Sequence, residues 1–400
     1  MKSNKKIEYY VTKSLFFSYF FIFSSNAVVG PLIPSIHENL KISYSLIGTM
    51  IFIGYLFTII FTLILGRFFD HFNKYNIIFI SFFITLLGNI FLFFSNNFYC
   101  FTLGFTLATM GVITHLIYGD SFLVSTYGAK GTNTYNTVHA IAAFGVAWAS
   151  ILVFIVYISG IYWKYVFIFN GIILLIFIFI YLKIGIRIRY KSPKMVLKSV
   201  KNSKEIYANI FGNIFIYLTS FLLFFHFALR RAFPDWLSTY ALTINIKPEY
   251  GILMVAAFSI AAGIARFTLN SMQKKLRTSN ILIIITLVSL ISIISINFID
   301  FVALKFVFIF ILGGTIGLIH PILTFFIMNE NINSTSTVGS ITYSVEYSAV
   351  MIMGLITGIF TDKIGGKAII YIAIVNCFLI TIGAIIFNIF LRKKNKISQS

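Results

Sequence analysis

The sequence has few charged residues. Only 10% of its 400 residues are Asp, Glu, Lys or Arg, whereas soluble domains carry about 25%. This excludes a soluble globular fold, because a water-facing surface needs far more charged side chains. Acidic residues are the scarcest, with 11 Asp and Glu against 31 Lys and Arg. A carboxylate inside an apolar segment is therefore a candidate for function in this chain.

Cysteine is nearly absent as well. Cys100 and Cys377 are the only two, and both lie in or beside apolar segments, so we expect no disulfide framework and no metal site. A GxxxxGK(S/T) loop is missing, which argues against ATP as the energy source, and no cofactor is expected. The spacings of a nucleophile triad or a catalytic metal centre are also missing, which argues against an enzyme.

Long apolar runs take up most of the chain, which is 59% hydrophobic and contains 47 Phe residues. Continuous runs separated by short polar breaks are typical of membrane-spanning helices, whereas a β-barrel would show alternation. The predicted fold class is an all-α integral membrane protein with twelve transmembrane helices in two six-helix halves. The expected spans lie approximately at residues 14–35, 44–66, 76–95, 98–126, 135–158, 164–185, 207–230, 250–270, 279–297, 302–328, 337–361 and 368–391.

Basic residues are sorted among the loops that join these spans. Most of them fall on the side of the N-terminus, and the longest basic stretch runs from Lys183 to Lys204. This bias predicts a multi-pass protein of the cell membrane with both termini cytoplasmic, and it makes the lipid bilayer, not nucleic acid, the partner of these charges. We predict an N-terminal half at 1–185, a basic cytoplasmic linker at 186–206 and a C-terminal half at 207–400.

One apolar span, Val138 to Ile158, carries His139 near its start. About 21 residues at a rise of 1.5 Å cross a hydrocarbon core of about 30 Å, so this histidine should lie inside the membrane. An ionisable ring there costs free energy unless it faces protein or water. We therefore expect a cavity or a partner beside it.

Two motifs around this span resemble those of a known family. Residues 135–146, YNTVHAIAAFGV, are similar to the LNLLHAFFGVG signature of fucose-permease-like transporters in the Major Facilitator Superfamily, with Asn136 and His139 in register. Residues 163–167, WKYVF, resemble the corner that opens the sixth span across that superfamily. The resemblance implies a monomeric secondary transporter that moves a small solute by alternating access and is driven by protons or another coupling ion.

The turn after the second span resembles the gating motif of the same superfamily, GxxxD(R/K)xG(R/K). Gly66, Arg67 and Asp70 match it. In the family this segment bridges neighbouring spans on the cytoplasmic side and steadies the outward-facing state; the alternative is a plain charged turn. A second copy at residues 358–367 follows the eleventh span on the outer side, where we expect a structural turn.

Asp120 is the only acidic residue deep in the N-terminal half. Span four, which contains it, also carries a stripe of hydrogen-bonding side chains on one helix face. The stripe consists of Thr114, Tyr118, Ser121 and Ser125. We expect Asp120 to carry a proton during transport, with His115 within helical reach. The structural alternative is that Asp120 simply pairs with His115 or His139.

The C-terminal half holds four further candidates. They are Arg230 and Arg231 near the end of span seven, His320 in span ten and Glu346 in span eleven. Glu346 occupies the place in the second half that His139 occupies in the first, as a duplicated unit predicts. We expect one arginine to pair with Glu346 and to favour an anionic substrate; the alternative places both arginines at the outer interface.

The predicted function is secondary active transport of a sugar or an organic anion, with drug-type efflux as a further possibility. A membrane receptor that binds a small ligand without moving it is the alternative from another class. An embedded enzyme would need a paired constellation at catalytic range, for which His115, Asp120 and His139 offer little support.

Overall fold

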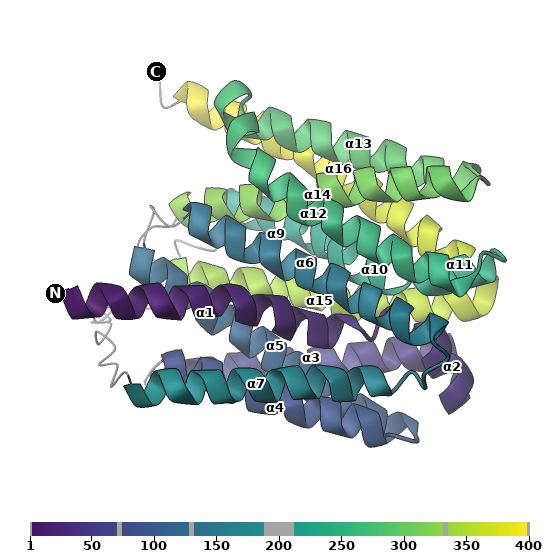
Figure 1. The fold of residues 1–400 in the computed structure, drawn as a ribbon. Helices are drawn as coiled ribbons and strands as arrows, with labels where there is room; N and C mark the ends of the chain where they lie inside the picture. Colours follow the sequence, from purple (N-terminus) through teal and green to yellow (C-terminus); the bar gives the residue numbers. More distant parts are fainter. Residues whose placement is uncertain (1, 70–73, 128–131, 188–211, 331–334, 398–400) are drawn as a thin grey trace.

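The computed structural model describes residues 2–69, 74–127, 132–187, 212–330 and 335–397, which form a bundle of long helices (Figure 1). The first part of the chain forms α1 (Lys2–Ala27), α2 (Ile33–Leu40), α3 (Tyr44–Phe69), α4 (Lys74–Phe94), α5 (Phe98–Tyr127), α6 (Thr132–Ile158) and α7 (Tyr165–Arg187). The second part forms α9 (Ile214–Phe227), η2 (Ala228–Ala232), α10 (Phe233–Asp235), α11 (Leu237–Thr243), α12 (Pro248–Lys275), α13 (Thr278–Phe298), α14 (Val302–Glu330), α15 (Thr335–Ile364) and α16 (Lys367–Ile397).

Within the described residues, eleven helical segments are long and apolar enough to cross a membrane. They correspond to the second through twelfth expected spans, which confirms the all-α membrane fold. The 26-residue α1 takes the place of the first span and packs against α6, α5 and α7. Its apolar run is interrupted by Ser18, Ser24, Ser25 and Asn26, all buried, so these polar groups face the interior of the bundle.

The outside of the bundle is apolar. Leu63, Phe179 and Ile291 are more than half exposed, and many other large hydrophobic side chains around the bundle are exposed as well. In water such a surface would be unfavourable, whereas lipid tails solvate it.

The seventh span differs from the expectation of 207–230. Its helix begins at Ile214, passes through a π-helical turn at Ala228–Ala232 and continues in α10 and α11 as far as Thr243. The prediction ended it too early, because two arginines and a proline resemble the end of a span. In the structure, Pro234 stands in the first turn of α10, where its missing N–H costs no hydrogen bond.

The two parts of the chain meet mainly along two helix pairs, α3 with α15 and α6 with α12. Both chain termini lie at the same end of the bundle, which we call the terminus end; α2 and α11 lie at the opposite, loop end (Figure 1). At the loop end the contact is close, since a Cβ atom on Gly30 would stand only 2.7 Å from Cα of Asp235. Ser238 of α11 also donates a hydrogen bond to the Gly30 carbonyl across 3.3 Å.

The second copy of the gating motif caps a helix of the other half. Asp362, near the end of α15, accepts hydrogen bonds from the backbone N–H groups of Tyr44 (3.0 Å) and Ser45 (2.7 Å) and from the Ser45 hydroxyl (2.5 Å). A carboxylate at a helix N-terminus satisfies unpaired N–H groups and interacts favourably with the helix dipole. The residues expected to form a structural turn thus also hold α15 to α3 at the loop end.

Replacing this cap should favour opening of the loop end. We expect Asp362→Ala to remove about 1 kcal/mol from the closed arrangement, the usual value of a helix cap, or about a fivefold change in the ratio of closed to open molecules. Spin labels on exposed Lys41→Cys and Lys363→Cys, in a chain lacking Cys100 and Cys377, report the distance between the halves by pulsed electron paramagnetic resonance. Asp300→Ala, an exposed acid outside this contact, is the control. An unchanged distance distribution in Asp362→Ala would mean that the cap does not hold the halves together.

Candidate functional site

Two buried carboxylates each lie beside a histidine. His139 Nε2 on α6 lies 3.1 Å and 3.2 Å from the two carboxylate oxygens of Asp120 on α5. His320 Nε2 on α14 lies 3.2 Å from Oε1 of Glu346 on α15. All four residues are at most 5% exposed. Among the described residues, the ion-pair partner of Glu346 is His320 on the adjacent helix, while Arg230 acts on Glu346 at longer range, so the expected pairing with an arginine stays a prediction.

The two pairs lie on equivalent spans of the two parts of the chain, but the acid and the histidine have exchanged places. The first has its acid on the fourth span and its histidine on the fifth, and the second has its histidine on the tenth and its acid on the eleventh. The rings of His139 and His320 approach to 5.9 Å between centroids. Asp120, His139, His320 and Glu346 thus form a continuous buried line across the contact between the halves.

Tyrosines surround the Asp120 carboxylate. Tyr19 of α1 donates a hydrogen bond to it across 2.8 Å, and Tyr135 of α6 approaches it at 3.4 Å. Tyr343 of α15 donates a third, short hydrogen bond from the other half. Because this donor and its acceptor belong to different halves, relative movement of the halves would break the bond.

Arg266 is a buried cation that our sequence reasoning left without a role. It is 2% exposed on α12. Its Nη1 donates to the backbone carbonyl of His139, and its Nε donates to that of Gly317 across 3.3 Å. The side chain therefore links α12 to α6 and to α14 beside both histidines. A charge within an apolar span is itself the signal that should have singled it out.

Arg231 lies between the halves. Its Nη2 donates to Asn26 Oδ1 of α1 across 2.5 Å and its Nε to the Tyr55 hydroxyl of α3 across 3.3 Å, while its Nη1 lies 3.5 Å from Asp235. Arg231 therefore packs against protein side chains of both halves. The π-helical turn that contains it adds a residue to the helix and is a feature often found at functional sites.

Arg230, its neighbour in the π-helical turn, has no hydrogen bond or ion pair among the described residues. Its guanidinium lies 5.5 Å from the centre of the buried Phe227 ring. The charged and phenolic groups that act on it are Glu346, Tyr347, Tyr135 and Tyr343. Arg230 is thus partly buried and lies within electrostatic reach of the second acid–histidine pair, and its place at the outer interface stays an alternative.

The remaining N-terminal candidates lie in different surroundings. His115 is fully buried, but its ring nitrogens lie 3.0 Å from the Ser18 hydroxyl and 3.1 Å from that of Ser81, so it is not the partner of Asp120. Tyr118 and Asn136 are both buried in their helices, 7% and 8% exposed. The side chain of Ser121 lies outside the part of the chain that the structure describes.

The gating motif remains a prediction. Gly66 and Arg67 belong to the last turns of α3, but their side chains are not among those described, and Asp70 lies outside the described residues. The described His, Cys, Asp and Glu side chains contain no group of three that could hold a metal ion.

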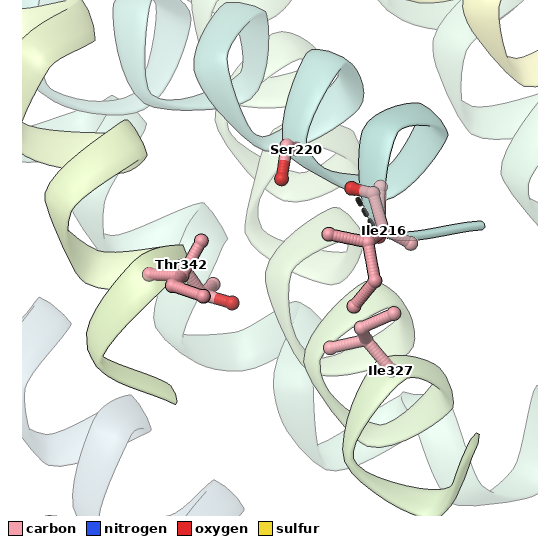
Figure 2. Close-up of a pocket in the computed structure, with 6 residues that line it drawn as sticks. Ile216, Ser220, Ile327 and Thr342 are labelled. Carbon is pink, nitrogen blue, oxygen red and sulfur yellow. Dashed lines mark hydrogen bonds between the residues drawn. The ribbon is translucent and has the colours of Figure 1, made fainter. Parts of the chain in front are cut away.

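A small pocket lies between α9, α14 and α15. The space between its lining side chains is about 180 Å³, open solvent included. Figure 2 shows Ile216 and Ile327 side by side on one wall and Thr342 on the facing helix. Thr342 precedes Glu346 by one helical turn on α15.

Buried charges enclosed between two parts of a membrane-spanning helical bundle mark a functional site and are typical of membrane transporters. The sequence profile of the Major Facilitator Superfamily matches residues 15–351, and the chain belongs to this superfamily. It is therefore a multi-pass membrane transporter of a small-molecule substrate and not an enzyme.

Solved structures share this fold at low sequence identity. The E. coli fucose:proton symporter, solved as a single-residue variant, has a TM-score of 0.66 and 14% identity, over 94% of this chain and 98% of that chain. A variant of the nucleoside transporter NupG has a TM-score of 0.73 and 10% identity, with the same coverage. No curated sequence matches the chain. The superfamily is thus established, whereas resemblance to the fucose-permease group stays a prediction.

Proposed function

We propose that the protein is a proton-coupled transporter of a sugar or an organic anion, with Asp120–His139 and His320–Glu346 as the groups that carry protons. The observation that carries the proposal is the meeting of the two pairs at the contact between the halves. The fold it shares with a fucose:proton symporter supports the architecture and not the substrate.

Movement of the halves would change the surroundings of these groups, and this change would couple proton transfer to transport. The Tyr343 hydrogen bond to Asp120 and the approach of His139 to His320 both cross the contact. When the halves rock apart, Asp120 loses a donor and gains water. Both changes alter the proton affinity of a carboxylate, so a proton can be taken up in one state and released in the other.

The proposal includes the arrangement of the molecule in the cell. Residues 1–185 and 207–400 act as two moving halves joined by a basic linker at 186–206, with both termini in the cytoplasm of a cell-membrane protein that works as a monomer. The excess of basic residues in the loops at the terminus end supports this orientation.

Transport by purified protein in lipid vesicles tests the proposal. A thermal-shift panel of sugars, organic anions and cationic drugs first identifies a compound that raises the melting midpoint. With a radiolabelled form of that compound and a pH gradient, we expect accumulation inside vesicles that a protonophore abolishes. Binding without accumulation would support the receptor instead, and accumulation insensitive to a protonophore would indicate another coupling ion.

A further inference from the structure

Donors without acceptors gather around the second acid–histidine pair. Arg230 has no hydrogen bond or ion pair among the described residues. Nη2 of Arg266 and both ring nitrogens of His226 are buried and likewise lack hydrogen-bond partners within the described chain, and so do both carboxylate oxygens of Glu346. Buried polar atoms in native proteins are almost always satisfied, so unpaired ones indicate a missing partner. A partner for the three groups that can donate must offer acceptor oxygens, whereas the Glu346 oxygens need a donor, which a proton supplies.

The charges in the same region repel each other. Arg230 acts on Arg266, and both arginines act on His226. Phe227 offers the Arg230 guanidinium only the face of its ring. An acceptor that also carries negative charge would satisfy these donors and offset their repulsion, and guanidinium groups bind carboxylate and phosphate oxygens particularly well.

The sum of the charges in the interior indicates that a proton must bind together with such an anion. Three arginines and three carboxylates lie in this region, so the fully ionised set is neutral with uncharged histidines. Its members are Arg230, Arg231, Arg266, Asp120, Asp235 and Glu346. An anion alone would leave the interior with one unbalanced negative charge, which is costly at low dielectric. One proton on a carboxylate or histidine removes that excess.

We infer that the substrate is a small organic anion, bound by Arg230 and carried together with a proton. This inference rests on the proposed function and narrows its substrate class from sugars and anions to anions alone. Arg230 is the residue that determines this preference, while His226 and Arg266 contribute further donors.

The proton and the anion should strengthen each other's binding. The groups that face His320 are Glu346 of α15, His139 of α6, His226 of α9, Arg230 of η2 and Arg266 of α12. Four of these five are cations or histidines, so a proton added to this set is favoured when an anion is present. Because coupling between two ligands is reciprocal, anion affinity should rise as pH falls, by at most tenfold per pH unit for one linked proton.

Binding to the purified full-length protein tests the inference without requiring transport. The panel pairs each anion with a neutral compound of the same skeleton: lactate with lactamide, gluconate with glucitol, benzoate with benzamide, and succinate with succinamide. We expect at least one anion to raise the melting midpoint more than its neutral partner, with a larger shift at pH 5.5 than at pH 7.5. Arg230→Gln should weaken that anion roughly tenfold to a hundredfold.

Two control variants distinguish loss of the anion site from a general loss of charge or of folding. Arg277→Gln removes the same charge at an exposed position outside the interior and should bind the anion as the wild type does. Arg230→Lys keeps the charge and should retain part of the affinity even where Arg230→Gln folds poorly. A panel in which no anion exceeds its neutral partner overturns the inference, as does wild-type anion affinity in Arg230→Gln. Failure of vesicle accumulation with anion binding intact would instead overturn the proposed transport function.

Discussion

Asp120→Asn should abolish accumulation of substrate against a gradient while leaving exchange between equilibrated compartments. Asparagine resembles the protonated carboxyl in size and cannot take up or release a proton, so the halves can still rock without moving protons. Tyr19 and Tyr343 donate to different carboxylate oxygens, so one of them can still donate to the amide oxygen of the variant while the other meets the amide nitrogen. We expect at least a tenfold loss of accumulation with exchange within about twofold of the wild type, both measured in vesicles with a labelled substrate.

The matched control is Asp300→Asn, which removes an exposed acid from the turn between α13 and α14 and should leave both assays unchanged. If Asp120→Asn still concentrates substrate and a protonophore abolishes that uptake, Asp120 is not the proton carrier. Glu346 would then be the next residue to neutralise, because it is the carboxylate of the second acid–histidine pair.

Much of the fold was predictable, because hydrophobic runs separated by short polar breaks leave few alternatives to membrane-spanning helices. The expected start of span two at residue 44 and that of α3 at Tyr44 coincide, and most other starts agree to within about three residues. Spans one and seven were the exceptions, since α1 begins at Lys2 and not at residue 14, and α9 begins at Ile214 and not at residue 207. Hydropathy measures the free energy needed to place a charge in lipid, but it does not indicate whether protein surrounds that charge.

The sequence indicated which polar residues lie buried in the bundle more reliably than it indicated which of them contact each other. Asp120 and His139 were expected as one possible pair and form it. His320 and Glu346 were each selected, but their contact depends on how the tenth and eleventh spans pack, which one-dimensional spacing does not report. Tyr343 was not selected as a candidate. It precedes Glu346 by three residues, and the helical period could have placed both side chains on the same face of this helix.

Arg266 was missed as a contributor to structure, and its removal should produce the largest loss of stability. Arg266→Met leaves the interior with one more carboxylate than guanidinium and removes the donors that reach the carbonyls of His139 and Gly317. Breaking the compensation of a buried charge costs about 3–5 kcal/mol. We expect the melting midpoint in detergent to fall by several degrees and α6 and α12 to separate more readily.

Arg266→Lys separates the effect of charge from that of geometry. An ammonium group keeps the charge but lacks the planar fork that serves two carbonyls on different helices, so this variant should melt between the wild type and Arg266→Met. Arg277→Met, at an exposed position, should shift stability by no more than about 0.5 kcal/mol. Equal midpoints for Arg266→Lys and the wild type would show that charge alone matters. If Arg266→Met also melts with the wild type, the link from α12 to α6 and α14 contributes nothing measurable, and its place beside His139 must be explained by transport.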